Sequence, residues 1–214
     1  MNMTLRYWLI LITLCLGTQA AGPFDALAQS TLPLPGDFDE TFAVTSLHRP
    51  FVPDAPAVVR LDTRRFVVHN KREAEEHVRR AVTILKPEGK RFARLVLPYD
   101  KFRHIDRLEG RIRDAHGNVI RKLGDDDQRN LSAISDYSLY EENKVRVAEL
   151  FHSTYPYTVE FEYTIERDGL ISWPTWRAQE RKLAVEYAAF EIAAPTRMPI
   201  RYTVKNGDWT PEEG

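Results

Sequence analysis

The stretch "TVEFEYTIE" (158–166) alternates apolar and polar side chains with the period of two that is typical of a β-strand. Its apolar residues would face a core, and these are Val159, Phe161, Tyr163 and Ile165. Glu160 and Glu162 would point the other way, towards solvent. The stretch therefore predicts a half-buried strand, and its two carboxylates raise the question of whether they carry out chemistry.

Short alternating runs of the same kind, separated by turn residues, follow one another from Ala57 onwards. The expected strands are 57–69, 77–85, 91–99, 104–114, 118–123, 145–151, 158–166, 182–195 and 199–207. "AHGN" (115–118) is a hairpin signal, and 126–134 is expected to form a short helix capped by Asp125 or Asp126. Because strands do not alternate with helices, the pattern predicts an all-β fold, an antiparallel β-sandwich with at most one short helix.

One segment has conflicting signals. In "KREAEEHVRRAVTIL" (71–85) the apolar residues recur at helical spacing, and Ala, Glu and Arg are strong helix formers. Local propensity alone therefore favours a helix where the order of the surrounding strands favours a strand.

The N-terminus has the features of a secretory signal peptide, which we assign to residues 1–28. Arg6 supplies the positive charge, and "YWLILITLCLG" (7–17) supplies an apolar segment too short for a typical spanning helix. Cleavage after Ala20 or after Ala28 fits the small residues there. The chain is expected to be exported to the periplasm or cell envelope, and an uncleaved signal would be its only membrane contact.

Composition excludes several classes of function. The 30 basic and 31 acidic residues nearly cancel, which gives no electrostatic basis for binding nucleic acid. Cys15 is the only cysteine and lies in the signal, so the mature chain has no disulfide, thiolate metal site or cysteine nucleophile. The six histidines lack the spacing of a zinc site, and no motif indicates a cofactor.

Two pairs of residues are candidate sites. Glu160 and Glu162, two residues apart on a strand, have the separation of about 6.5–7 Å that suits an inverting glycosidase. A solvent-facing strand has the same pattern, and this interpretation is favoured. Trp173 and Trp176 in "SWPTW" (172–176) could form a platform for a sugar or a peptide. The favoured alternative is that both rings cover the edge of the sandwich.

Four segments in this order resemble the family called domain of unknown function 3857. "LKPEGKRFARLVLPYDKF" (85–102) resembles its "I-L-x-x-x-G-x-x-x-A…P-Y-D" segment, and "RIRDAHGNVIRKL" (111–123) its strand–turn–strand unit. "AISDYSLYEENKVRVAELF" (133–151) is similar to its "D…S-x-Y" stretch and following strand. "YPYTVEFEYTIE" (155–166) resembles "P-G-x-x-I-E-Y-x-Y", except that Tyr157 stands where the family has glycine.

The resemblance implies an exported bacterial β-sandwich module over residues 57–207, and a strand rather than a helix at 77–85. Residues 29–56, which prolines interrupt and which show no periodicity, are expected to form a Pro-rich leader before the module. Residues 208–214 are expected to start a linker after it. The family typically precedes a transglutaminase-like domain, which would be the partner of this module. Protein or cell-wall polymer is the alternative partner. No catalytic residue and no metal ligand carries over to this chain.

Overall fold

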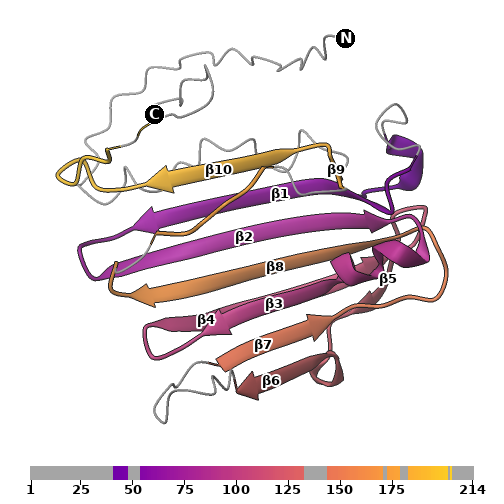
Figure 1. Cartoon of the computed structure of the whole chain (residues 1–214), viewed down its shortest axis with the longest axis horizontal. Helices are drawn as coiled ribbons and strands as arrows, with labels where there is room; N and C mark the ends of the chain where they lie inside the picture. The colour runs from indigo at the N-terminus through magenta and orange to yellow at the C-terminus, as the bar shows by residue number, and fades with distance from the viewer. Residues whose placement is uncertain are drawn as a thin grey trace, which may run out of the picture.

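The computed structural model describes residues 41–47, 54–132, 144–170, 173–178, 183–201 and 203, and most of them lie in two β-sheets (Figure 1). The larger sheet has the strand order β10-β1-β2-β8-β4-β5, with β9 beside β1. Its strands are β1 Ala57–Val68, β2 Glu73–Ile84, β4 Arg103–Arg113, β5 Val119–Lys122, β8 Tyr157–Asp168, β9 Ala184–Val185 and β10 Ala188–Ala193. The smaller sheet has the order β3-β7-β6, with β3 Arg94–Tyr99, β6 Gln128–Ser132 and β7 Lys144–Glu149.

Helical structure in the described part of the chain is limited to three 3₁₀ segments. These are η3 Val44–Ser46, η5 Pro87–Ala93 and η6 Asp125–Asp127. A search of the described residues finds no helix with the length and apolar character needed to span a membrane. The predicted signal peptide lies outside the described residues.

The predicted β-sandwich is confirmed, and its strand pairs are antiparallel with two exceptions. Both β9 and β10 run parallel to β1. The chain leaves the end of β8, crosses the sheet and returns along the far edge of β1 (Figure 1). A parallel pair needs such a crossover connection, which a hairpin cannot supply.

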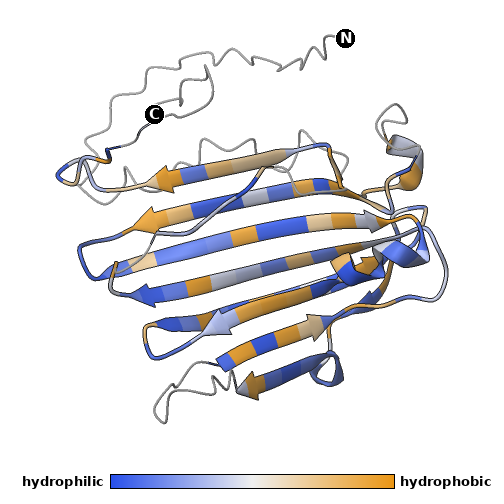
Figure 2. Ribbon diagram, viewed as in Figure 1, coloured by the Kyte–Doolittle hydropathy of each residue, from blue (hydrophilic) through white to orange (hydrophobic). Residues whose placement is uncertain are grey.

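The core lies between the inner face of the larger sheet and the smaller sheet. The apolar side chains of β8 predicted to face it are indeed buried, with 1–7% of each exposed: Val159, Phe161, Tyr163 and Ile165. From the other layer, Leu97 packs against Tyr163 and Ile165, and Ala148 and Leu150 pack in the same cluster as Val159. Figure 2 shows hydrophobic and hydrophilic residues alternating along the strands, as a sheet with one core face requires.

The segment with conflicting signals is a strand, as the family resemblance predicts. All twelve residues of β2 pair with β8, from Glu73↔Asp168 to Ile84↔Tyr157, and β2 pairs with β1 on its other side. These two ladders supply partners for the backbone on both edges, and they outweigh the local preference for a helix because propensities are weak relative to tertiary packing.

Several predicted boundaries need correction. The short helix at 126–134 is wrong, because only the single turn η6 forms and residues 128–132 pair with β7 as β6. The strand expected at 91–99 begins at Arg94, after η5. Residues 199–201 and 203 form no strand, and the rest of the expected strand 199–207 lies outside the described residues.

The hairpin expected at 115–118 is confirmed between β4 and β5. Gly117 has φ +89°, a conformation that favours glycine. The Asp114 carboxylate accepts hydrogen bonds from the backbone N–H groups of His116 and Asn118, both at 2.9 Å. These bonds to the ionised form hold the pKa of Asp114 below its usual value, led by the side-chain bond from Asn118.

Residues 41–47 belong to the folded domain rather than to a leader outside it. Phe42 is 3% exposed and packs with Leu61 and Ala81 on the outer face of the larger sheet. The Arg60 guanidinium donates to the backbone carbonyls of Phe42 and Ala43 and to the Ser46 hydroxyl. We call residues 41–47 the N-terminal plug.

Replacing Phe42 with alanine should lower the free energy of unfolding by about 3 kcal/mol, because it empties a buried aromatic site. Phe102→Ala is the matched control, since Phe102 is 43% exposed and its loss should change stability by less than about 1 kcal/mol. Urea titration followed by tryptophan fluorescence measures both. Equal effects of the two substitutions would show that the plug does not pack as described.

Tyr163 makes the fold sensitive to alkaline pH. Burial raises its pKa to about 12 from the usual 10.0. The folded state therefore keeps the proton that the unfolded state loses, and the free energy of unfolding should fall by up to about 1.4 kcal/mol per pH unit between these values. Tyr163→Phe should flatten this part of the pH profile, while Tyr99→Phe on β3 should leave its slope unchanged.

Candidate functional site

The outer face of the larger sheet carries rows of polar side chains that run across β1, β2, β8 and β4. The register of the three ladders defines each row. One row is Arg65, His77, Thr164 and Arg107, and the next is Thr63, Arg79, Glu162 and Glu109. A third row brings together Glu75, Glu166 and His104. Four strands from three separate parts of the sequence thus build one continuous charged surface.

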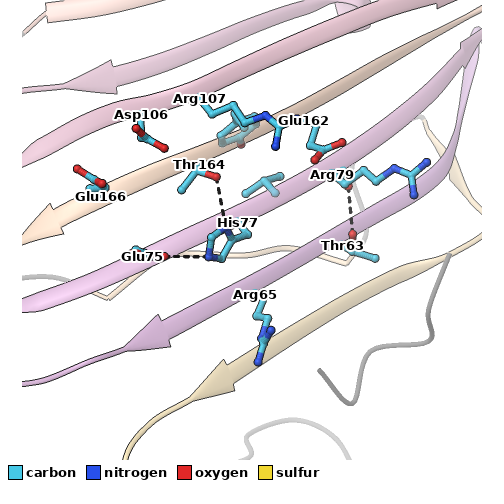
Figure 3. Close-up of a pocket in the computed structure, with 12 residues that line it drawn as sticks. Thr63, Arg65, Glu75, His77, Arg79, Asp106, Arg107, Glu162, Thr164 and Glu166 are labelled. Carbon is cyan, nitrogen blue, oxygen red and sulfur yellow. Dashed lines mark hydrogen bonds and ion pairs between the residues drawn. The ribbon is translucent and has the colours of Figure 1, made fainter. Parts of the chain in front are cut away.

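A cavity of 420 Å³ opens on this surface, within the range of small-ligand sites (Figure 3). We call it the outer-face hollow. Its polar lining residues are Thr63, Arg65, Glu75, His77, Arg79, Asp106, Arg107, Glu162, Thr164 and Glu166. In the sequence these residues show the alternation of an ordinary solvent-facing strand. Only the pairing of the strands brings them together around one cavity.

His77 connects a hydroxyl and a carboxylate inside the hollow. Its Nδ1 lies 3.2 Å from the Thr164 hydroxyl and its Nε2 lies 3.2 Å from Glu75, as the dashed lines in Figure 3 mark. Glu75 also lies 3.3 Å from Nε2 of His69. The order hydroxyl, imidazole, carboxylate is that of a nucleophilic triad.

The backbone around Thr164 belongs to two ladders. Thr164 lies in the middle of β8, paired with His77 on one side and Arg107 on the other. The register of the β4 ladder shifts between Ile105 and Arg107, which places a β-bulge beside Thr164. The contacts of His77 with Thr164 and Glu75 therefore tie β8 to β2 on the outer face.

Glu160 lies beside the hollow but is buried, and the prediction that it faces water is wrong. Its exposed fraction is 1%. Arg79 donates to Oε1 at 2.9 and 3.0 Å, while Arg113 donates to Oε2 at 3.2 and 3.3 Å. Arg111 pairs with Oε2 at 3.3 Å. The N-terminal plug covers the same end of the face, where the Thr158 hydroxyl meets the Phe42 carbonyl at 3.5 Å.

Glu162 differs from Glu160, because it is half-buried in the hollow and has no hydrogen bond or ion pair with any described residue. A glycosidase needs one carboxyl group that donates a proton and another that activates water or attacks the sugar. Both oxygens of Glu160 are already occupied by guanidinium groups. The two glutamates therefore do not form an acid–base pair.

Trp173 and Trp176 lie over the inner face of the sheet, on the side opposite the hollow. The Trp176 ring stacks on Phe190 with centroids 5.7 Å apart, and Trp173 is tilted over Phe66 at 5.4 Å. This matches the interpretation in which both rings cover the edge of the sandwich. Trp173 remains 49% exposed, whereas Trp176 is half-buried.

The inner face also contains charged residues that the alternating pattern does not reveal. Glu76, 2% exposed, lies 2.9 Å from Arg64 and also pairs with Arg167. Asp62 accepts from Arg80 at 2.7 Å. Their cross-strand register places opposite charges together beside the buried Phe66, Tyr163 and Ile165. Among the described residues, no group of three His, Cys, Asp or Glu side chains could hold a metal ion.

Glu160→Gln should lower the free energy of unfolding by about 3 kcal/mol, because it leaves three guanidinium groups around a neutral, buried side chain. Glu88→Gln, at an exposed position in η5, should change stability by less than about 0.5 kcal/mol. Denaturant titration of both variants tests this. A Glu160→Gln variant as stable as the parent would show that the arginines do not depend on this carboxylate.

Comparison with solved structures shows the same fold in a larger protein. The crystal structure of a putative protease from Parabacteroides distasonis matches with a TM-score of 0.56 and 14% identity, over 67% of this chain and 30% of that one. An M1 zinc metallopeptidase from Deinococcus radiodurans matches with a TM-score of only 0.28 and 14% identity, over 63% of this chain and 27% of that one. The chain thus spans less than a third of the length of either protein.

Sequence comparison gives a family but no characterised relative. No curated protein matches the chain. The family model described as "Domain of Unknown Function with solved-structure structure (DUF3857)" matches residues 70–213, more than half of the chain. The matched region contains every strand from β2 onwards. The chain therefore belongs to the domain of unknown function 3857 family.

Proposed function

We propose that this chain is an exported, non-catalytic β-sandwich module that binds substrate or acts as a scaffold for a downstream transglutaminase-like or peptidase-like domain. The observation that carries the proposal is the outer-face hollow. It is an open, charged cavity on a four-stranded surface, and its polar side chains come from strands that are far from any sequence motif of a nucleophile.

The share of a longer protein that this fold occupies supports a role inside a larger protein. In the putative protease from Parabacteroides distasonis, the matched region makes up 30% of the chain. A module of this kind would leave the remaining length for a catalytic domain. Interfaces between domains of one chain are commonly polar and of moderate size, which suits a sheet whose outer face is charged.

A cell-wall-binding module that uses Trp173 and Trp176 is the alternative. The exposed half of the Trp173 ring favours it, since sugars bind to exposed aromatic faces. Trp176 already stacks on Phe190 and offers less free ring surface. Retention of the chain on insoluble cell-wall material, lost in Trp173→Ala, would support this alternative.

We expect the coding sequence beyond Gly214 to contain a domain with Cys, His and Asp residues. Deleting the module from that longer protein should raise KM for protein substrates, with kcat for a small amide substrate unchanged. Those results would follow if the module contributes binding and not chemistry. The module alone should turn over neither substrate. Turnover by the module alone, or an unchanged KM after its deletion, would overturn the proposal.

A further inference from the structure

We propose that the outer-face hollow binds a cationic group, the ammonium or guanidinium of a basic polypeptide segment. This inference rests on the proposed substrate-binding role and names the class of substrate. It follows from three features of the hollow. Its positive charges are already paired, its strand register brings like charges together, and its carboxylates are spread along β8.

The positive charges of the hollow are already paired. Arg65 pairs with Glu191 at 3.3 Å, Arg79 with Glu160 at 2.9 Å and Arg107 with Glu109 at 2.7 Å. His77 lies against Glu75 and Thr164. A negatively charged ligand would have to compete with these carboxylates for the positive charge of each arginine.

The groups of the hollow that remain available to a ligand are hydrogen-bond acceptors. Asp106, Glu162 and Glu166 line the hollow and make no hydrogen bond or ion pair with any residue that the structure describes. The Thr63 hydroxyl donates to the Arg79 carbonyl at 3.4 Å, which leaves its oxygen able to accept. A ligand that complements these groups must be rich in N–H donors and positively charged.

The strand register gives a second, independent indication. Glu75 and Glu166 are directly opposite each other across β2 and β8, and Glu109 and Glu162 are directly opposite across β8 and β4. Like charges in directly opposed positions destabilise a sheet. In the first pair Glu75 lies against His69 and His77, at 3.3 and 3.2 Å, whereas Glu166 has no ion pair with any described residue.

The surroundings of Arg107 show the same excess of negative charge. Glu109 raises the pKa of this exposed guanidinium by a side-chain hydrogen bond and by its charge, and the charges of Glu162 and Asp106 raise it further. One cation thus faces three carboxylates. A second cation, supplied by a ligand, would reduce the repulsion between Glu109 and Glu162 and between Glu75 and Glu166.

The spacing of the carboxylates in the hollow favours a polypeptide over a metal ion as the ligand. Within the described ranges no three ligating side chains converge closely enough to hold a metal. The carboxylates are spread along β8 from Glu162 to Glu166, four residues or about 13 Å apart at the usual rise per residue. Two cationic side chains of one extended segment can span that length, whereas a single small cation cannot.

The test uses the purified chain and a fluorescein-labelled peptide, Gly-Lys-Gly-Gly-Gly-Lys-Gly, whose lysines are four residues apart, with fluorescence anisotropy as the readout. The same peptide with glutamate in place of lysine is one control ligand. Unlabelled spermidine, as competitor, distinguishes a free polyamine from a polypeptide as the source of the cation. We expect the lysine peptide to bind, the glutamate peptide not to bind, and spermidine to compete only weakly. Stronger binding of spermidine than of the peptide would overturn the assignment to a polypeptide.

Two variants separate binding from structure. Glu162→Gln and Glu166→Gln should each weaken peptide binding by about fivefold, and should raise the melting temperature by about 1–3 °C because each removes a like-charge pair. Glu88→Gln in η5 is the matched control and should change neither quantity. Unchanged peptide affinity in both hollow variants, or no binding by the parent chain, would overturn the inference.

The outcomes for this inference and for the proposed function can be told apart. If the hollow variants bind normally while deletion of the module still raises KM in the longer protein, the ligand class is wrong and the substrate-binding role stands. If the peptide binds through Glu162 and Glu166 while deletion leaves KM unchanged, the site is real and the proposed role is wrong.

Discussion

The antiparallel ladder between β2 and β8 is the interaction on which the rest of the structure depends. It pairs twelve residues on each strand without interruption. Because side chains alternate between the two faces, a slip of one residue would move Val159, Phe161 and Tyr163 from the core to the outer face. It would also place Glu160 in the apolar core. The same register therefore sets the core on one side and the charged rows on the other.

The buried carboxylate of Glu160 makes that register more specific. Removing a charged group from water is unfavourable unless partners surround it, and here they come from β2 and β4, on both sides of β8. Any other register would separate these partners. The N-terminal plug completes the arrangement by covering the end of the outer face where Phe42 meets Thr158.

The two faces of the larger sheet consequently have different roles. The smaller sheet covers the inner face at one end, and the segment with Trp173 and Trp176 covers Phe66 and Phe190 towards β10. Of the segments that the structure describes, the plug covers one end of the outer face, and the hollow opens beyond it. The rings of Trp173 and Trp176 thus pack on the inner face, whereas the outer face carries the charged rows around the hollow.

Alternation along the chain was enough to predict an all-β sandwich, the core side of "TVEFEYTIE" and the hairpin turn at Gly117, because each depends on neighbouring residues alone. Composition likewise excluded cysteine chemistry. Local propensity favoured a helix at 71–85, and the long-range ladders of β2 overrode it, as the family resemblance predicted. Only the tertiary structure decided that β10 runs parallel to β1 and that Phe42 packs on the sheet. It also decided that Glu160 is buried while Glu162 lines a cavity. Those outcomes depend on which strands lie beside one another, and residues as distant as Arg79 and Glu160 meet only through long-range pairing.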